Sequence, residues 1–557
     1  MPTLTWVGKD KVVNHHHKIP FRVLNYEYKY EAIKDAPVNV TNNKIIYGDN
    51  LEVLKSLLPE FEGKINCIYI DPPYNTGNEG WIYNDAVNDP KIKKWLGQVV
   101  GKEGDDLSRH DKWLCMMYPR LKLLHRLLAR DGVIFVSIGD GEQANLRLLM
   151  DEIFSENKKL STFIWRTDGN FDNQAKIKNC HEYILMYAKS PESFAHPQVV
   201  DPSVGEKSKL NNPFIRNTIV KNGHKNPESE VRLIAGFPAD FESGVIPART
   251  NKYPHYNSDL VITNKSLVNA VVATTGWSSK SLLMDFIKNN FNPVLDMKGQ
   301  KTRFVITESG TIESIKERES RSHVISVIGG VGSTQSQSLE LSDMGFKFPF
   351  PKPLDLIKYL ISMHCDKNAI VLDSFAGSGT TAEAVLKLNK QDKGNRRFIL
   401  VEMMDYAETL TTKRVEMVMS GYGNGAKKVD GLGGGFDYYT VGEPIFNANE
   451  TLNESVGIAA IRNYIAHSEG VDTEFRMAKD NPFISYLIGL DTDTAWIFYY
   501  DEKSVTCLDM DFLGSLKFGE NKPGTAIIYA DKCLLNKSFM KKHGIIFKKI
   551  PRDITRF

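Results

Sequence analysis

The chain has 557 residues, of which 41% are hydrophobic, so it is long enough to bury several cores, and length favours about three or four domains. Its formal net charge is +2, which argues neither for nor against a nucleic-acid partner. Six cysteines without a C-x-x-C spacing fit reduced thiols better than a disulfide framework or a zinc site. No long apolar run or secretory leader is present, so we expect a soluble, cytoplasmic protein.

Residues 44–196 alternate short β-branched runs with longer segments whose apolar residues recur at helical spacing. Such alternation is typical of a parallel sheet covered by helices. A polar N-terminal segment, 1–43, precedes this region, and its adjacent histidines are not expected to bind a metal. The pattern predicts strands at 45–47, 65–70, 133–138 and 181–187, and helices at 51–58 and 111–130.

Asp71-Pro72-Pro73-Tyr74 follows the predicted strand 65–70, where a parallel sheet opens into a cleft. A ring-conjugated exocyclic amine is a poor nucleophile because its lone pair is delocalised, so a catalyst must draw its hydrogens toward fixed acceptors. We predict that the Asp71 carboxylate and the Pro72 carbonyl are these acceptors, since proline restricts the neighbouring dihedrals. Tyr74 is predicted to stack on a base swung out of a duplex. The motif thus suggests methylation of an exocyclic amine; the alternative is a surface turn.

Two irregular stretches interrupt the pattern. The first, 78–110, carries aromatic residues beside charges and is predicted to form a lid over the site. The second, 197–345, is rich in Asn, Gly, Pro and Ser and marks a change of domain. Within it Phe214 lies among basic residues that are predicted to contact phosphates, although a solvated loop face is the alternative: Lys207, Lys209, Arg216, Lys221 and Lys225.

Helical and strand patterning returns at 346–429, so the α/β domain is interrupted and not duplicated. After a predicted strand at 369–372 comes a glycine turn, and the next predicted strand, 398–401, ends at Glu402. Glycines at such a turn expose backbone N–H groups to a nucleotide-like ligand, and an acidic residue about 20 positions later accepts hydrogen bonds from ribose hydroxyls. Packing alone is the alternative. The turn is Asp373-Ser374-Phe375-Ala376-Gly377-Ser378-Gly379-Thr380.

Two features complete the pattern. Asp49, at the end of the strand 45–47, adds a carboxylate at the same sheet edge, and it is also a candidate N-cap for the helix that follows.

Residues 430–557 begin in a glycine-rich passage and contain further strand-like runs, so we predict a separate small domain for dimer or partner docking. No P-loop motif is present, so the sequence does not encode a P-loop nucleotidase.

The two motifs together resemble the halves of S-adenosylmethionine-dependent DNA amino-methyltransferases. The chain resembles the modification (Mod) subunit of Type III restriction–modification systems, which are β-class N6-adenine methyltransferases with the catalytic motif ahead of the cofactor motif. Further stretches that match this family are Gly48-Asp49, 71–77, 113–138, His181-Glu182-Tyr183, Pro351-Lys352-Pro353 and 550–554.

This resemblance implies a Rossmann-like, doubly wound and circularly permuted methyltransferase sheet, with catalytic part 44–196 and cofactor-binding part 346–429. It further implies a target recognition domain at 197–345 and a small C-terminal α/β domain. Asp49 would approach the cofactor's adenine ring, and Lys352 would hold its methionine end. The expected activity is methyl transfer from S-adenosylmethionine to the N6 amine of a flipped adenine in double-stranded DNA, by a homodimer.

Several alternatives stay open at this stage. Asp71 favours adenine over N4-cytosine, because N4-cytosine enzymes usually carry serine there, and the absence of Pro-Cys argues against C5-cytosine chemistry. The enzyme would protect host DNA beside a helicase–nuclease restriction subunit or act as an orphan. In a different class, the chain would be a DNA-reading specificity subunit that docks a separate helicase–nuclease. Neither a metal nor a membrane is expected.

Overall fold

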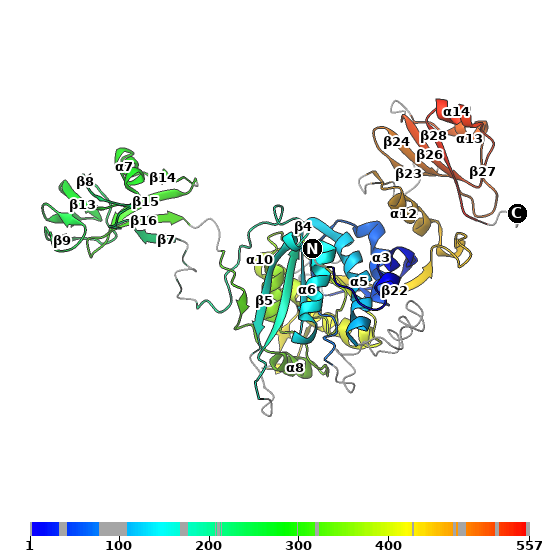
Figure 1. Ribbon diagram of the computed structural model, residues 1–557, viewed down its shortest axis with the longest axis horizontal. Coiled ribbons are helices and arrows are strands. Elements are labelled where there is room, and N and C mark those ends of the chain that lie inside the picture. The colour runs from blue at the N-terminus through cyan, green and yellow to red at the C-terminus, as the bar shows by residue number, and fades with distance from the viewer. Residues whose placement is uncertain are drawn as a thin grey trace. The chain divides into compact units, whose positions relative to one another are not determined.

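The computed structural model describes residues 3–32, 42–76, 109–167, 176–205, 208, 212, 214–297, 299–317, 322–425, 428–471, 475–476, 486–518 and 523–552. The chain forms two compact units (Figure 1). The first consists of Met1–Pro197 and Ile325–Phe557, and the second of Gln198–Val324. The predicted lid, 78–110, lies almost wholly outside the described residues, as do Lys207 and Lys209.

The first unit is built on one ten-stranded sheet. The strands from β22 to β4 run parallel, β6 is antiparallel to both neighbours, and β1 is antiparallel to β22 at one edge. The order is β1 (Arg22–Glu31), β22 (Gly435–Pro444), β2 (Asn43–Tyr47), β19 (Arg397–Glu402), β18 (Ile370–Asp373), β3 (Ile65–Ile70), β4 (Leu128–Ile138), β6 (His181–Ala188), β5 (Lys159–Arg166) and β17 (Val327–Ile328).

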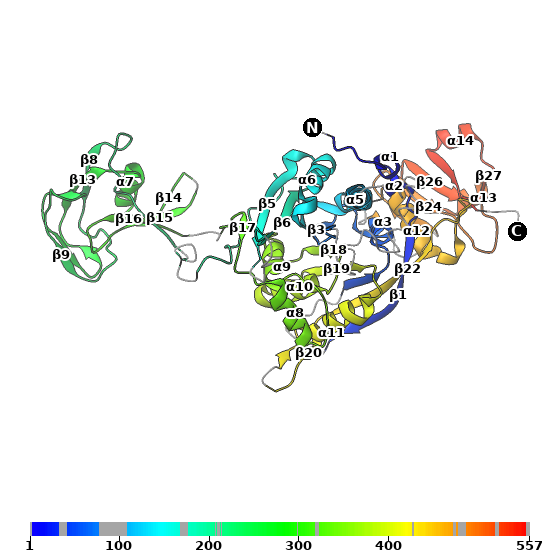
Figure 2. The ribbon, with the colours of Figure 1, turned by 60° about the horizontal axis from the view of Figure 1, so that its bottom comes forward.

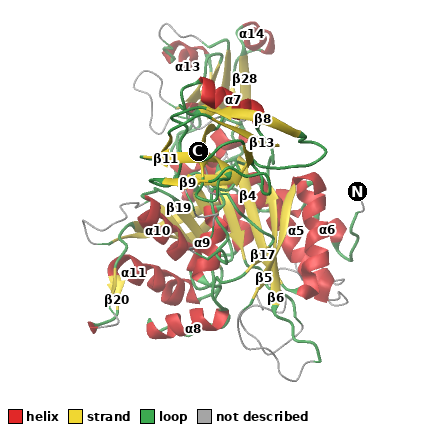
Figure 3. Cartoon of the chain, turned by 90° about the vertical axis from the view of Figure 1, so that its left-hand side faces the viewer, coloured by secondary structure: helices red, strands yellow, loops and turns green. Residues whose placement is uncertain are grey.

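Helices cover both faces of this sheet, as Figures 2 and 3 show. On one face lie α3 (Asn50–Phe61), α5 (Arg109–Leu127) and α6 (Asp140–Phe154). On the other lie α8 (Thr334–Asp343), α9 (Leu354–Ser362), α10 (Thr380–Asp392) and α11 (Lys413–Ser420), the last preceded by a π-helical turn, η4 (Ala407–Thr412). Buried aliphatic and aromatic side chains from α3, α5 and α6 pack on the strands in one core. The predicted doubly wound α/β fold is confirmed.

The central strands β3 and β18 are neighbours although about three hundred positions separate them in the sequence. Their register pairs Val371 with Cys67 and Leu372 with Ile68. Every residue of β18 is buried, as are most of β3, which explains why both read as nearly continuous apolar runs. Because parallel strands end at the same sheet edge, the residues that follow β3 and β18 emerge side by side.

The C-terminal part of the first unit contains a smaller mixed sheet, in which β24, β26 and β28 are parallel and β23 is antiparallel to β24. Its helix α12 packs on α3, and Phe21 stacks edge-on against Tyr464. The sequence predicted a separate domain at 430–557, but β22, which lies in that stretch, is a strand of the main sheet. The elements are α12 (Ile458–Ser468), β23 (Leu487–Leu490), β24 (Thr494–Phe498), α13 (Met510–Ser515), β26 (Thr525–Ala530), α14 (Lys537–Lys542) and β28 (Ile545–Lys549).

Short elements complete the described part of the first unit. They are α1 (Lys9–Val12), α2 (His15–Lys18), η2 (Glu156–Lys158), β20 (Gly421–Tyr422), β21 (Val429–Asp430), η6 (Glu454–Val456), β25 (Cys507–Leu508) and β27 (Lys532–Cys533). No helix in the described ranges is long and apolar enough to span a bilayer.

The second unit consists of small antiparallel sheets around its own core, which includes the buried rings of Phe237, Phe286 and Phe304. It lies inside the predicted stretch 197–345, and β17 and α8 from the end of that stretch belong to the first unit. Its elements are β7 (Phe214–Thr218), β8 (Glu228–Leu233), β9 (Gly244–Ile246), β10 (His255–Tyr256), β11 (Leu260–Thr263), β12 (Ser266–Leu267), β13 (Val271–Gly276), α7 (Lys280–Lys288), β14 (Val294–Leu295), β15 (Lys301–Ile306) and β16 (Ile312–Glu317).

A buried ion pair fastens α11 to α10 in the first unit. The side chain of Arg414 is fully buried, and its Nη2 lies 2.8 Å from Glu383 Oε2. Its Nη1 donates to the carbonyl and hydroxyl of Ser378 and to Thr380 Oγ1. Removing one member of such a pair leaves an uncompensated buried charge.

We therefore expect Glu383→Met to lower the free energy of unfolding by about 3–5 kcal/mol. Urea denaturation followed by tryptophan fluorescence measures this loss. The matched control is Glu416→Met, which removes the partner of the half-exposed Lys413 on α11 and should cost less than about 1 kcal/mol. Equal losses in the two variants would contradict the interpretation.

Candidate active site

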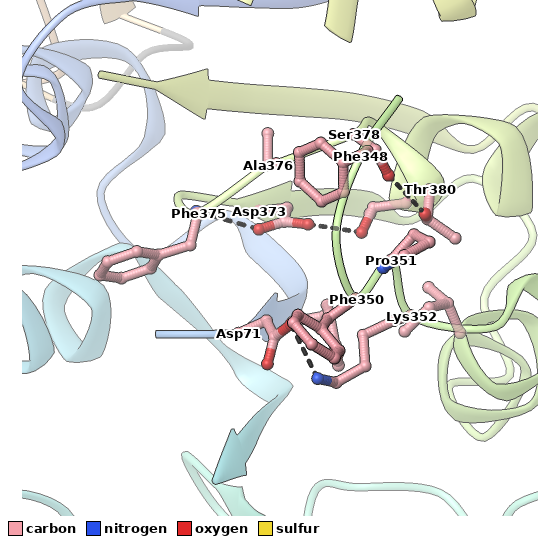
Figure 4. Close-up of a pocket in the computed structure, with 14 residues that line it drawn as sticks. Asp71, Phe348, Phe350, Pro351, Lys352, Asp373, Phe375, Ala376, Ser378 and Thr380 are labelled. Atoms are coloured by element: carbon pink, nitrogen blue, oxygen red, sulfur yellow. Dashed lines mark hydrogen bonds and ion pairs between the residues drawn. The ribbon is translucent and has the colours of Figure 1, made fainter. Parts of the chain in front are cut away.

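A pocket opens where β3 and β18 end, and both sequence motifs contribute to it (Figure 4). The pocket is partly open to solvent. Its lining combines apolar rings with a few polar groups, which is typical of small-molecule sites. The lining residues are Tyr69, Asp71, Phe348, Phe350, Pro351, Lys352, Ile357, Asp373, Phe375, Ala376, Gly377, Ser378, Thr380 and Thr381.

The turn between β18 and α10 needs its two glycines. Gly377 has φ 52° and Gly379 has φ 81°, in the left-handed region that other residues disfavour. A Cβ on Gly377 would lie 3.3 Å from Phe348 Cζ, and one on Gly379 would lie 3.3 Å from the Thr411 carbonyl oxygen. The glycines therefore allow both the tight turn and the close approach of neighbouring groups.

Two buried carboxylates hold this turn. Asp373 accepts hydrogen bonds from the Phe375 N–H (3.0 Å) and the Thr381 hydroxyl (2.5 Å). Glu402, at the end of β19, accepts from the N–H groups of Gly377 (2.8 Å) and Met404 (2.9 Å). Burial raises the pKa of Asp373 to about 7 and that of Glu402 to about 7. Both groups therefore change charge near neutral pH.

Asp71 stands at the opposite wall of the pocket and its two oxygens have different surroundings. Oδ2 lies 3.0 Å from the Lys352 ammonium (Figure 4). Oδ1 is buried and has no hydrogen-bond partner among the described residues. Burial raises the pKa of Asp71, and Lys352 opposes this shift. A buried acceptor without a partner is costly, so Oδ1 is the natural place for a donor from a ligand.

Tyr74 is held on several sides. Its hydroxyl donates to Glu182 Oε2 at 2.7 Å, and the Lys352 ammonium lies 4.7 Å from the centre of its ring. Gly139 faces the ring so closely that a Cβ there would lie 3.0 Å from Tyr74 Cδ2. The preceding Pro73 carbonyl accepts a 2.7 Å hydrogen bond from Trp113 Nε1. The motif is thus fixed by contacts from α5, β6 and the segment that follows β4.

The remaining predicted cofactor residue, Asp49, caps α3, because its side chain accepts from the N–H groups of Leu51 (2.8 Å) and Glu52 (3.4 Å). It also lies 3.6 Å from the buried guanidinium of Arg120. Asp49, Gly379 and Glu402 are not among the residues that line the pocket. The N-cap interpretation is confirmed; contact with a cofactor stays a prediction.

The predicted DNA-contacting residues that the structure describes lie in the second unit. Arg216, on β7, pairs with the carboxylates of Asp240 and Glu313, so its charge is largely neutralised. Lys221 and Lys225 are exposed around a tight turn that follows β7. Their role in DNA binding stays a prediction.

Sequence reasoning assigned no role to Glu182 or Trp113, which complete the site. Glu182 lies in the stretch 181–183 that matches the Mod family, and Trp113 begins the apolar helical pattern. The adjacent sequence does not reveal that Glu182 contacts Tyr74 or that Trp113 contacts Pro73. In the described ranges no cluster of three or more His, Cys, Asp or Glu side chains is arranged to hold a metal ion.

The DNA methylase family model matches residues 65–413, a span that contains both motifs and the second unit. The chain belongs to this family. It is 34% identical over 428 residues to the EcoPI Mod subunit of a Type III restriction-modification enzyme from Escherichia phage P1, and 30% identical over 435 residues to the EcoP15I Mod subunit from Escherichia coli. The matches cover 72% of this chain in both cases and 63% and 64% of the relatives.

The resemblance to Mod subunits that the motifs indicated is thereby confirmed, and the chain spans less than two thirds of the length of these relatives. Among solved structures, a DNA modification methylase from Thermus thermophilus in complex with S-adenosyl-L-methionine is 14% identical with a TM-score of 0.33. That match covers 72% of this chain and 98% of the other.

The ion pair at the pocket predicts how stability depends on pH in a variant. Lys352→Met leaves Asp71 buried beside Glu182 without the cation, so the pKa of Asp71 in the folded protein should rise further. A carboxyl with a raised folded pKa stabilises the fold while protonated and loses that contribution as pH rises through it. We expect the melting temperature of Lys352→Met to fall below wild type by more at pH 8 than at pH 5.5.

Differential scanning fluorimetry at the two pH values makes this measurement. The control is Lys358→Met, which removes a partly exposed lysine that pairs with the exposed Asp355 on α9 and should show no pH-dependent deficit. A deficit in Lys352→Met that is the same at both pH values would contradict the assignment of charge to this cluster.

Proposed function

We propose that the protein is a site-specific DNA-methyltransferase that transfers a methyl group from S-adenosylmethionine to the N6 amine of adenine in double-stranded DNA. The observation that carries the proposal is the buried Oδ1 of Asp71, which has no hydrogen-bond partner among the described residues and lies in one pocket with the glycine turn. A carboxylate oxygen there accepts an N–H of the target amine and localises the nitrogen lone pair.

The chemistry is a direct displacement that positioning and electrostatics accelerate. The nitrogen lone pair forms a bond to the methyl carbon, the carbon–sulfur bond breaks, and its electron pair stays on sulfur. The nitrogen then releases a proton, for which Asp71 is the nearest proposed acceptor. Tyr74 would stack on the extruded base, because a base inside a duplex is out of reach of the pocket.

The residues of the pocket fit S-adenosylmethionine. A Cβ at Gly377 would fill space beside Phe348, so the glycine turn leaves room for a ligand against the rings of Phe348 and Phe375. When bound, this cofactor supplies a methyl group activated by a sulfonium. We propose that the turn from Asp373 to Thr380 and Glu402 hold its nucleoside part and that Lys352 meets its methionine end.

The relatives are named as subunits of Type III restriction-modification enzymes, and we propose host-protective modification in such a system, or as an orphan enzyme, for this chain. The second unit would read the target sequence, with Lys221 and Lys225 on phosphates. A homodimer and a helicase–nuclease restriction subunit are the proposed protein partners, and DNA as substrate fits a cytoplasmic location. The intact pocket favours catalysis over a purely DNA-reading subunit, and Asp71 favours adenine over N4-cytosine.

Asp71→Ala should abolish methylation and preserve cofactor binding, because Asp71 faces the target amine while the glycine turn holds the cofactor. In a methylation-free host, single-molecule sequencing should map modified adenines for wild type and none for the variant. With purified protein we expect methyl transfer to fall by at least about 100-fold and the dissociation constant for S-adenosylmethionine to change less than about threefold. Methylation retained by Asp71→Ala would contradict the assignment.

Cofactor binding should strengthen between pH 6 and pH 8. Because burial raises the pKa of Glu402 to about 7, its carboxylate is mostly protonated at pH 6 and mostly ionised at pH 8, and the ionised form accepts hydrogen bonds more strongly. Titration calorimetry should show up to about tenfold tighter binding from this group at the higher pH. Glu402→Gln is the control and should have a flatter dependence than wild type; identical profiles would reject the role of Glu402.

A further inference from the structure

Glu182 connects two residues of the proposed catalytic motif. It lies at the start of β6, where the sheet register pairs it with Trp165 of β5. Its Oε2 accepts the Tyr74 hydroxyl at 2.7 Å and lies 3.3 Å from the Lys352 ammonium, which in turn lies 3.0 Å from Asp71. The side chains of Lys352, Asp71 and Glu182 are 6%, 14% and 21% exposed, so water screens these contacts little.

We propose that Glu182 is a positioning residue for the methyl transfer: it fixes the ring of Tyr74 and, by sharing the Lys352 ammonium with Asp71, keeps the Asp71 carboxylate a strong proton acceptor. This inference rests on the proposed function. It is carried by the geometry of one buried ammonium between two carboxylates, one of which also holds the phenol.

The first part concerns the orientation of Tyr74. Burial, with Asp71 and Glu182 nearby, holds the pKa of Tyr74 well above its usual range. The phenol therefore stays protonated and donates a hydrogen bond to Glu182. Gly139 bounds the ring on one side and Lys352 lies over it at 4.7 Å. Because the hydroxyl is anchored, the ring is held in one orientation for stacking on a base. It therefore loses little rotamer entropy when the base binds.

The second part concerns the charge that Asp71 experiences. The titratable groups that face it are Lys352, Glu182, Tyr74, Tyr69 and Asp373. Burial raises the pKa of Asp71, Lys352 lowers it, and the negative charge of Glu182 raises it again. As the nitrogen–methyl bond forms and the carbon–sulfur bond breaks, the amine gives up a proton, and a carboxylate with a raised pKa takes it more readily. Without the negative charge of Glu182, the Lys352 ammonium would interact with Asp71 alone. The pKa of Asp71 would then be lower, and Asp71 would be a weaker base.

Two substitutions separate the parts. Glu182→Gln keeps an oxygen that accepts the Tyr74 hydroxyl but removes the charge, whereas Tyr74→Phe keeps the charge and the ring but removes the hydroxyl. We expect Glu182→Gln to lower kcat at least about tenfold and to move the acidic limb of the kcat–pH profile to lower pH, because the pKa of Asp71 falls. KM for S-adenosylmethionine should stay within about threefold.

Tyr74→Phe should raise KM for DNA and should not move the acidic limb to lower pH, because it leaves the charge of Glu182 in place and removes a hydroxyl that lowers the pKa of Asp71. Glu443→Gln, at an exposed position on β22, is the matched control and should retain wild-type kcat and pH profile. An acidic limb and kcat that do not move in Glu182→Gln would overturn the positioning role. Wild-type protein that transfers no methyl group to any duplex DNA would instead overturn the proposed function, and the methyl-transfer role of Glu182 with it.

A readout without activity tests the shared ammonium. At pH 8, adding Glu182→Gln to Lys352→Met should restore part of the melting temperature that Lys352→Met loses, because one buried carboxylate and not two then lacks a cation. Restoration supports the charge coupling whether or not methyl transfer is detected. Additive losses in the double variant would overturn the coupling.

Discussion

The parallel pairing of β3 with β18 is the constraint on which the rest of the site depends. Val371 lies beside Cys67 and Leu372 beside Ile68, all buried, so the two strands end at one edge of the sheet. Asp71 follows one strand directly and Asp373 ends the other. Buried apolar side chains on both faces hold this register, because a shift by one residue would exchange the faces on which they pack. The distance between the proposed acceptor and the glycine turn is therefore set by the sheet and not by a loop.

A second constraint is the cost of burying charge around this edge. Asp71, Asp373, Glu182 and Glu402 bring four carboxyl groups to one region. Backbone N–H groups and a hydroxyl satisfy Asp373 and Glu402, which accounts for the fixed shape of the turn. Lys352 is the cation between Asp71 and Glu182. The charge balance thus differs across the pocket: hydrogen bonds hold the wall at the glycine turn, and an ion pair holds the wall at the proposed catalytic motif.

The second unit is inserted between strands of the first without entering its sheet. Its own core, with Phe237, Phe286 and Phe304 fully buried, makes it a compact body by itself. An insertion that carries its own core leaves the packing of the host sheet undisturbed, because the stretches that flank it end in β6 and begin again in β17, both strands of that sheet. Substitutions in this unit can thus leave the pocket of the first unit unchanged.

The sequence by itself determined the two motifs, their order and the strands β2, β19, β18, β3, β4 and β6. Each is a local pattern: apolar runs for buried strands, glycines where φ must be positive, and proline beside the Asp71 carboxylate. Asp49 as an N-cap is of the same local kind. Only the tertiary structure decided that Glu182 holds Tyr74 and Lys352, that Trp113 holds the Pro73 carbonyl, that Arg216 is neutralised by two carboxylates, and that β1 and β22 extend the main sheet. The physical reason is that these contacts join side chains and strands distant in the sequence, and a residue's type does not reveal which distant partner the packing brings to it.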